Sequence, residues 1–243
     1  MRALRIGLIL LVILGGLAVA ADRLAVNMAE GEIASKVRQT QGLDADPSVS
    51  IGGFPFLTQL VGKELESVEL GVDSYAVRVD DQEGAVEDLT IRLEDVRLEN
   101  TYERAVAARA SGEGTLSYAE MQRLTVPEDS TFGVAYSYGG DGEIELRVTV
   151  MGQAVGPAMG GDITVEGDLV RVSVEDIPSF ADVPVVGSID GIDERIRERV
   201  DQQRQLSGLP SGVEVDGLEA TEDGVTLRLS GTDVILAGTP AAE

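Results

Sequence analysis

The chain of 243 residues contains no cysteine, no histidine and no tryptophan. Without cysteine, disulfides and a lipoprotein thioether are excluded, so an ordinary apolar core must stabilise the fold. Without histidine and cysteine, Ser-His-Asp and Cys-His catalysis and the usual zinc sites are excluded too. We therefore expect a protein that is not an enzyme, with no catalytic residue, no metal and no cofactor.

Positive charge is also scarce. The chain has 19 Lys and Arg against 43 Asp and Glu, a formal net charge of -24, and its only lysines are Lys36 and Lys63. Such a chain is repelled by nucleic acid and offers no polybasic patch to anionic lipid, so no nucleic-acid partner is expected. Its acidic runs lack the alternating oxygen ligands of a calcium loop, which favours solubility as the role of the acidity.

The carboxylates leave one enzyme class open, a glycosidase with paired acidic residues. Such enzymes normally line a sugar cleft with aromatic side chains, and this chain has four Phe and five Tyr. A carboxylate-dependent glycan-active enzyme is therefore the least favoured alternative.

The N-terminus has the order of a secretory signal peptide. Arg2 and Arg5 precede an uncharged apolar run over residues 6–21, which ends in small side chains. These 16 residues are fewer than the roughly 20 of a comfortable membrane span. We expect export to an extracytoplasmic, periplasm-like envelope space with cleavage near Ala20; the alternative is a retained anchor through residues 6–21.

Apolar periodicity then predicts mixed secondary structure. Apolar residues at helical spacing predict a helix over 22–41, and alternating residues predict strands through 68–79 and 89–93. A slip of the apolar phase before Val96 predicts a β-bulge at Glu94-Asp95. Further strands are expected at 49–51, 107–116, 132–138, 144–150, 163–166, 169–174, 213–220 and 225–229, with helices at 56–61 (closed by Gly62), 117–124 (capped by Ser117 with Glu120) and 188–206.

This order of elements predicts an α+β fold. A strongly curved antiparallel sheet would wrap one or two long helices and leave an apolar groove; a flat sheet without a groove is the alternative. We expect residues 1–21 to be a signal peptide or anchor, 22–236 a single domain and 237–243 a flexible tail.

Two apolar segments are candidates for lining such a groove. The first places two phenylalanines beside a proline in a chain poor in aromatics, and the second is a glycine-rich loop that carries methionines. Plugging the end of the core is the alternative role of the phenylalanines. The candidate lipid-binding residues are Phe54, Phe56, Leu57, Leu60, Met151, Val155 and Met159.

The run Gly53-Phe54-Pro55-Phe56-Leu57-Thr58-Gln59-Leu60, the strand with Val68-Glu69-Leu70 and the hairpin with Gly224-Val225-Thr226-Leu227 resemble the actinobacterial LmeA-like phospholipid-binding proteins. The resemblance spans nearly the whole chain after the N-terminal apolar run. It implies a tubular lipid-binding fold of the BPI type, with a half-barrel sheet around a helix. It also implies a role in cell-envelope glycolipid assembly, specifically lipomannan elongation.

From these observations we expect an exported phospholipid-binding protein that holds acyl chains in an apolar groove. It would act as a carrier or accessory factor in envelope lipid or lipoglycan assembly. Its expected partners are acyl chains of phospholipid or glycolipid, the outer leaflet of the cytoplasmic membrane and an envelope glycosyltransferase. A structural or interaction protein of the envelope is the main alternative.

Overall fold

The structure is a computed structural model of the full chain. It describes residues 2–79, 82–99, 104–125, 131–167, 169–174, 177–180, 183, 194, 202–207 and 212–237. Structural statements below concern these residues.

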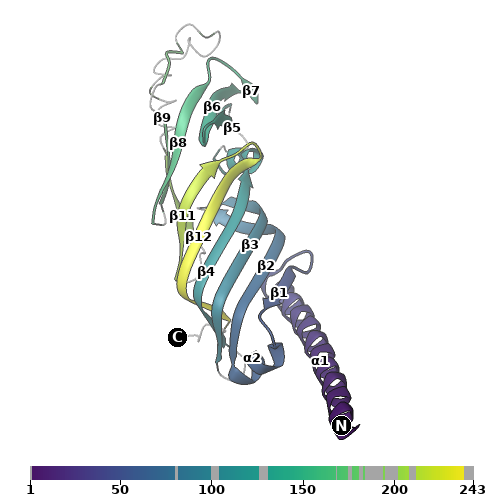
Figure 1. The fold of residues 1–243 in the computed structure, drawn as a ribbon. Coiled ribbons are helices and arrows are strands. Elements are labelled where there is room, and N and C mark those ends of the chain that lie inside the picture. The colour runs from purple at the N-terminus through teal and green to yellow at the C-terminus, as the bar shows by residue number, and fades with distance from the viewer. Residues whose placement is uncertain are drawn as a thin grey trace, which may run out of the picture. The chain divides into compact units, whose positions relative to one another are not determined.

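Strands outnumber helices in the described chain (Figure 1). The helices are α1 (Arg2–Gln41), α2 (Phe56–Gly62) and α3 (Tyr118–Thr125). The strands are β1 (Ser48–Gly52), β2 (Glu64–Val79), β3 (Gln82–Glu99), β4 (Arg104–Ser117), β5 (Phe132–Gly140), β6 (Glu143–Val150), β7 (Gln153–Ala154), β8 (Met159–Glu166), β9 (Leu169–Val174), β10 (Gln202–Ser207), β11 (Val213–Ala220) and β12 (Gly224–Ala237). The α+β prediction is confirmed.

The strands follow the order β11-β12-β4-β3-β2-β10-β9-β8-β6-β5, with β1 on β2 and β7 on β6. The pairs β1–β2, β2–β10, β10–β9, β9–β8, β8–β6, β6–β5, β6–β7 and β11–β12 are antiparallel. Hairpins supply most of the neighbours, as expected for a meander.

The chain forms two compact units. Unit 1 comprises residues 1–72, 90–110 and 232–243, and unit 2 comprises 73–89 and 111–231. The boundary crosses the long strands β2, β3, β4 and β12, so each of these contributes residues to both units. The single domain expected over residues 22–236 stays a prediction.

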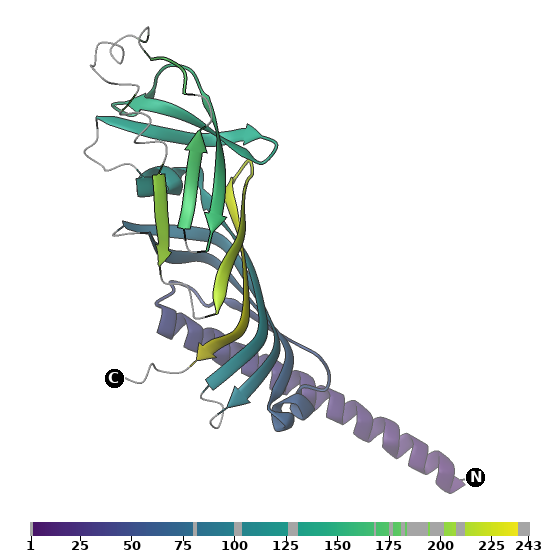
Figure 2. The same ribbon diagram turned by 90° about the vertical axis from the view of Figure 1, so that its left-hand side faces the viewer.

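In unit 1, the C-terminal half of α1 packs against strands and α2. Its apolar face meets side chains from β1 to β4, and the buried members of this core are Val26, Ile51, Phe56, Leu65, Val68, Leu93, Val96 and Ala107. The predicted helix over 22–41 is confirmed as part of α1, which starts earlier. Every described side chain from Arg5 to Ala21 is exposed, and both views show this half of α1 projecting away from the strands (Figures 1 and 2).

Unit 2 has a separate core under the β5–β6 hairpin and β8. Its buried members are Met121, Val134, Ile144, Leu146, Val148, Met159, Val172, Phe180, Ala220 and Val225. Helix α3 contributes Met121 to this core. Each unit therefore buries its own apolar cluster.

The bulge predicted at Glu94-Asp95 is confirmed. Along β3 the buried side chains are spaced by three residues between Leu93 and Val96, and Asp95 has a φ of 51°. A second slip separates Val86 from Leu89, with Asp88 also at a φ of 51°. Aspartate tolerates this left-handed region better than most residues, so each slip keeps the apolar side chains on one face of β3.

The predicted cap of α3, formed by Ser117 with Glu120, is confirmed in part. The Glu120 N–H donates a hydrogen bond to Ser117 Oγ (3.3 Å), as the capping motif predicts. The Glu120 carboxylate instead accepts a bond from the Ala85 N–H (3.2 Å) and pairs with Arg123, which fastens α3 to β3.

At α2, the prediction that Gly62 closes the helix is wrong. Lys63 takes the left-handed conformation, with a φ of 59°, and its N–H reaches the carbonyl oxygens of Gln59 and Leu60. Its neighbour Gly62 is still helical. The helix ends one residue later because β2 starts directly at Glu64 and the chain must reverse there.

The predicted helix over 188–206 is wrong at its end. Residues 202–206 form β10, which pairs with β9 through residues 202–205 and with β2 through Leu206. This polar segment forms a strand in spite of its helix propensity, because two neighbouring strands bond to its backbone N–H and C=O groups. Glu194 is helical, and the other residues of the prediction lie outside the described chain.

The start of β12 tolerates no side chain larger than hydrogen. Gly224 has a φ of 157°, and an added Cβ would lie 2.3 Å from the Leu116 carbonyl oxygen. We expect Gly224→Ala to lower the free energy of unfolding by about 3 kcal/mol, because backbone atoms cannot move aside cheaply. Gly167→Ala is the control: its φ is 66° and its Cβ would meet nothing within 4 Å, so about 1 kcal/mol is expected. Urea denaturation of both variants measures the difference, and equal losses would contradict the clash.

Candidate functional site

The first candidate segment is a turn between β1 and α2 that a glutamine side chain braces. Gln59 Nε2 donates to the Gly52 carbonyl oxygen (3.2 Å), and Gln59 Oε1 accepts from the Glu66 N–H (2.7 Å). The first bond holds the end of β1, and the second holds the start of β2. The phenylalanines in this turn are therefore presented by a fixed backbone.

Helix α2 begins without a side-chain cap of its own. Its N-cap residue is Pro55, which makes no capping hydrogen bond. The missing acceptor comes from α1, where Asp22 Oδ1 accepts a bond from the Leu57 N–H (2.8 Å). Glu30 on the same helix accepts a bond from the Ile51 N–H (2.9 Å). Two carboxylates of α1 thus hold the turn at both ends, because helix starts leave N–H groups unpaired.

Asp22 is almost completely buried, with 2% of its surface exposed. Its second oxygen, Oδ2, lies 3.9 Å from Arg23 Nη2 and accepts no hydrogen bond within the described chain. A buried carboxylate costs free energy unless its charge is compensated. The bond from Leu57 and the charge of Arg23 supply that compensation.

The four candidate residues in unit 1 divide between two directions. Phe56 is 3% exposed and belongs to the unit 1 core, against which Leu60 packs partly buried. Phe54 and Leu57 are 57% and 41% exposed. The guanidinium of Arg23 lies 5.1 Å from the centre of the Phe54 ring, a cation–π distance. Phe56 and Leu60 are thus brought together inside, while Phe54 and Leu57 face outward.

The three candidate residues in unit 2 also separate. Met159 is 2% exposed in the unit 2 core, and Val155 packs against the same cluster. The Val155 N–H donates to the Val148 carbonyl oxygen (2.8 Å), which ties this loop to β6. Met151 lies in a turn and is 83% exposed. Val155 and Met159 therefore share one apolar cluster, and Met151 stands apart from it.

Sequence reasoning missed two structural features of these segments. Asp22 and Glu30 act on residues 35 and 21 positions away, and the one hint was that no Ser, Thr, Asp or Asn precedes α2. Phe180 was not expected to be a core residue, yet it is fully buried in the unit 2 core. An added Cβ on Gly156 would lie 2.7 Å from its ring, so a glycine there lets the ring pack closely.

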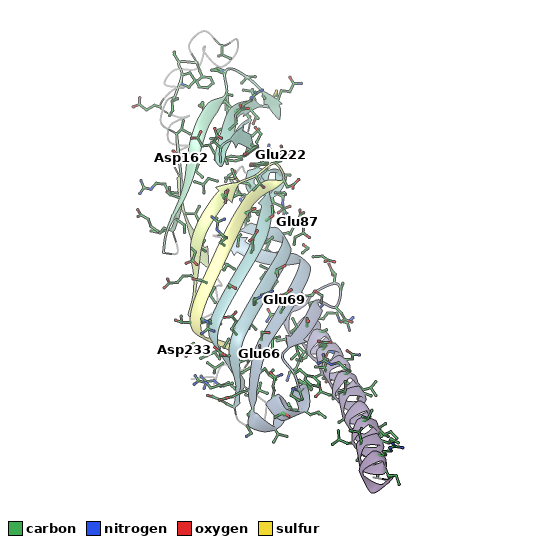
Figure 3. All side chains as sticks on the ribbon, viewed as in Figure 1. Glu66, Glu69, Glu87, Asp162, Glu222 and Asp233 are labelled. Atoms are coloured by element: carbon green, nitrogen blue, oxygen red, sulfur yellow. The ribbon has the colours of Figure 1, made fainter. Side chains whose placement is uncertain are left out.

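The strands of unit 1 carry exposed acid–base pairs. Figure 3 shows Glu66 and Glu69 projecting from β2, and Glu69 pairs with Arg92 of β3. Arg109 of β4 bridges Glu94 (2.9 Å) and Asp95 (2.8 Å), and its hydrogen bond to Glu94 is the main cause that raises the Arg109 pKa. Exposed pairs of this kind contribute little to stability, so the acidic side chains form a solvated surface.

Tyr118 packs against the unit 2 core. Burial raises the pKa of Tyr118, with a smaller effect from Tyr138, and its hydroxyl donates to the Thr221 carbonyl oxygen (2.7 Å). The hydroxyl therefore stays protonated as a structural donor between α3 and the β11–β12 turn. Among the described residues no group of three or more metal-binding side chains is found.

The N-terminal helix α1 also bears on function, through its length and apolar composition. From Arg5 to Gln41 it is long and apolar enough to cross a membrane. A signal sequence has the same properties, so the helix is consistent with either a signal peptide or an anchor.

Comparison with known proteins identifies the family. The model of the LmeA-like phospholipid-binding family matches residues 20–230, which include the turn before α2 and most of both units. No curated protein and no solved structure matches the chain. The matched region covers more than half of the sequence, and the chain therefore belongs to the LmeA-like phospholipid-binding family.

Proposed function

We propose that this protein holds the acyl chains of a phospholipid, or a related glycolipid, against its apolar interior and performs no covalent chemistry on them. The family match over residues 20–230 is the observation that carries the proposal. In this role the protein is an exported carrier or accessory factor in envelope lipid or lipoglycan assembly. It acts at the outer leaflet of the cytoplasmic membrane, with an envelope glycosyltransferase as the partner that uses the lipid.

The apolar clusters support this proposal physically. Half-buried apolar side chains surround each buried core, among them Leu60 in unit 1 and Val155 in unit 2. Each methylene removed from water contributes about 0.8 kcal/mol, so ten buried methylenes contribute about 8 kcal/mol. Only the part of this free energy that exceeds the loss of translational and conformational freedom on binding contributes to affinity.

The proposed architecture is a curved sheet that wraps a helix, as in tubular folds of the BPI type. Two features support it: the slips at Asp88 and Asp95, which bend β3, and the packing of α1 on strands of unit 1. We propose that the concave face of a sheet bent in this way is where an acyl chain lies. The seven candidate residues remain our proposal for lipid contacts, those of unit 1 and those of unit 2 each within their own unit.

The first test is the lipid content of the protein itself. We expect the full chain, extracted from membranes in mild detergent, to carry phospholipid that native mass spectrometry detects as a mass increment. Delipidated protein mixed with phosphatidylcholine should regain the increment, because apolar burial drives binding. Protein that neither retains nor takes up lipid would favour the structural or interaction protein of the envelope.

The second test asks which cluster holds the lipid. Leu60→Trp and Val155→Trp add bulk to half-buried positions, and Thr58→Trp and Gln153→Trp add the same bulk to exposed positions nearby. If a cluster contacts the acyl chain, we expect the tryptophan variant at its half-buried position to retain several-fold less lipid than the wild type. The reason is that the indole fills the space that the acyl chain would occupy. Native mass spectrometry measures the loss, and thermal unfolding confirms that each variant folds.

The two exposed variants should keep the lipid. If all four variants retained lipid equally, the candidate residues would not line the binding site. The family assignment would be untouched by that result.

A further inference from the structure

An exposed apolar surface lies on the outward side of α2. We define the α2 patch as Phe54, Leu57 and Val61; the last of these is 84% exposed and the other two are also exposed. Leu57 and Val61 are four residues apart on one helix, so they share a face. A group of large apolar side chains in contact with solvent usually marks an interaction site.

Two contacts tie this patch to α1 at one level along that helix. The Leu57 N–H bonds to Asp22, and the Phe54 ring lies against Arg23. Asp22 and Arg23 are the first charged residues after the exposed apolar stretch over residues 6–21. The patch is therefore fastened to the residues at which the apolar half of α1 ends, and both ribbon views place α2 beside this part of the helix (Figures 1 and 2).

The apolar half of α1 indicates what covers the patch. It belongs to a helix that is long and apolar enough to cross a membrane, and its side chains from Ile6 to Ala21 are exposed. When such a stretch lies in lipid, the first charged residues after it lie at the headgroup level. Asp22 and Arg23 would then sit at that level, with the patch beside them.

The residues around this level have the chemistry of a membrane interface. Arg23 lies over the Phe54 ring. An arginine keeps its charged end in water while its stem lies along apolar surface, and phenylalanine is typical of the apolar face of an interfacial helix. Leu24 continues the exposed apolar side chains on α1 directly after Arg23.

We propose that the α2 patch docks on the lipid bilayer, at the boundary between headgroups and acyl chains, beside the point where α1 enters it. This inference rests on the proposed function for the lipid nature of the partner. Apolar burial drives the docking, because a chain with a net charge of -24 and two lysines gains nothing from anionic headgroups. The patch and Asp22 follow the expected cleavage point near Ala20, so they remain in either form of the protein.

Docking in this orientation gives α2 a position between lipid and protein core. Its outward face carries Leu57 and Val61, and its inward face carries Phe56 and Leu60, which pack in the unit 1 core. A lipid that enters unit 1 from the bilayer would meet this helix first. The Gln59 and Asp22 bonds that hold α2 then also hold the point of entry.

The absence of cysteine makes a direct depth measurement simple. The full chain with Val61→Cys is labelled with an environment-sensitive fluorophore and reconstituted into phosphatidylcholine vesicles that contain nitroxide-labelled phosphatidylcholine. Lys36→Cys is the matched control, since it is exposed on α1 and lies fourteen residues, about 21 Å, beyond Asp22.

We expect the fluorophore at position 61 to be quenched several-fold more than the one at position 36, equally at low and high salt. Equal quenching at the two positions, or quenching at 61 that disappears at high salt, would overturn the docking proposal.

A second variant separates docking from lipid retention. In the full chain labelled through Leu57→Cys, we expect Val61→Asp to abolish the quenching, because a carboxylate must stay hydrated, whereas the exposed control Thr58→Asp should keep it. Val61→Asp alone should still retain lipid in the detergent extract, since its side chain lies outside the core. Unchanged quenching in Val61→Asp overturns the docking proposal, whereas a wild-type extract without lipid overturns the proposed function instead.

Discussion

The hydrogen bond from the Leu57 N–H to Asp22 is the contact on which the organisation of unit 1 depends. It supplies the cap that α2 lacks and fixes the turn to α1 at the residue where the exposed apolar stretch ends. Because Asp22 is buried, breaking the bond would leave its carboxylate without water or a hydrogen-bond donor. Loss of the bond is therefore unfavourable for Asp22 as well as for the start of α2. The turn held in this way carries Phe56 inward and Phe54 outward.

The apolar interior is organised as two clusters, one in each unit, on strands that are long enough to contribute to both. In β3 a slip of one residue at Asp88 and another at Asp95 shift the inside–outside alternation. The side chains on both sides of each slip, Val86 and Leu89 and then Leu93 and Val96, are therefore all buried. Acidic side chains such as Glu69, Glu94 and Glu219 pair with arginine at the exposed surface.

Lipid binding in this family therefore has to be explained by apolar surface and its placement rather than by a reactive constellation. Inward and outward apolar residues have different roles. Leu60 and Val155 are examples of the first kind, and Leu57 and Val61 of the second. Inward side chains exclude water from whatever they contact. Outward apolar side chains in contact with water raise the free energy of the protein, and contact with a lipid surface would remove that cost.

The sequence by itself determined the exclusion of disulfides and of cysteine or histidine chemistry, the apolar N-terminal helix, nearly all strand positions, the bulge at Asp95 and the family, because each depends on residue type or on local period. Tertiary structure alone decided that residues 202–206 are a strand, that Lys63 ends α2 and that Asp22 caps it. It also divided the candidate residues between two units and two directions. For residues 202–206 and for Asp22, the physical reason is that the hydrogen-bond partners lie tens of residues away, which periodicity does not record. Lys63 ends α2 because β2 begins at the next residue.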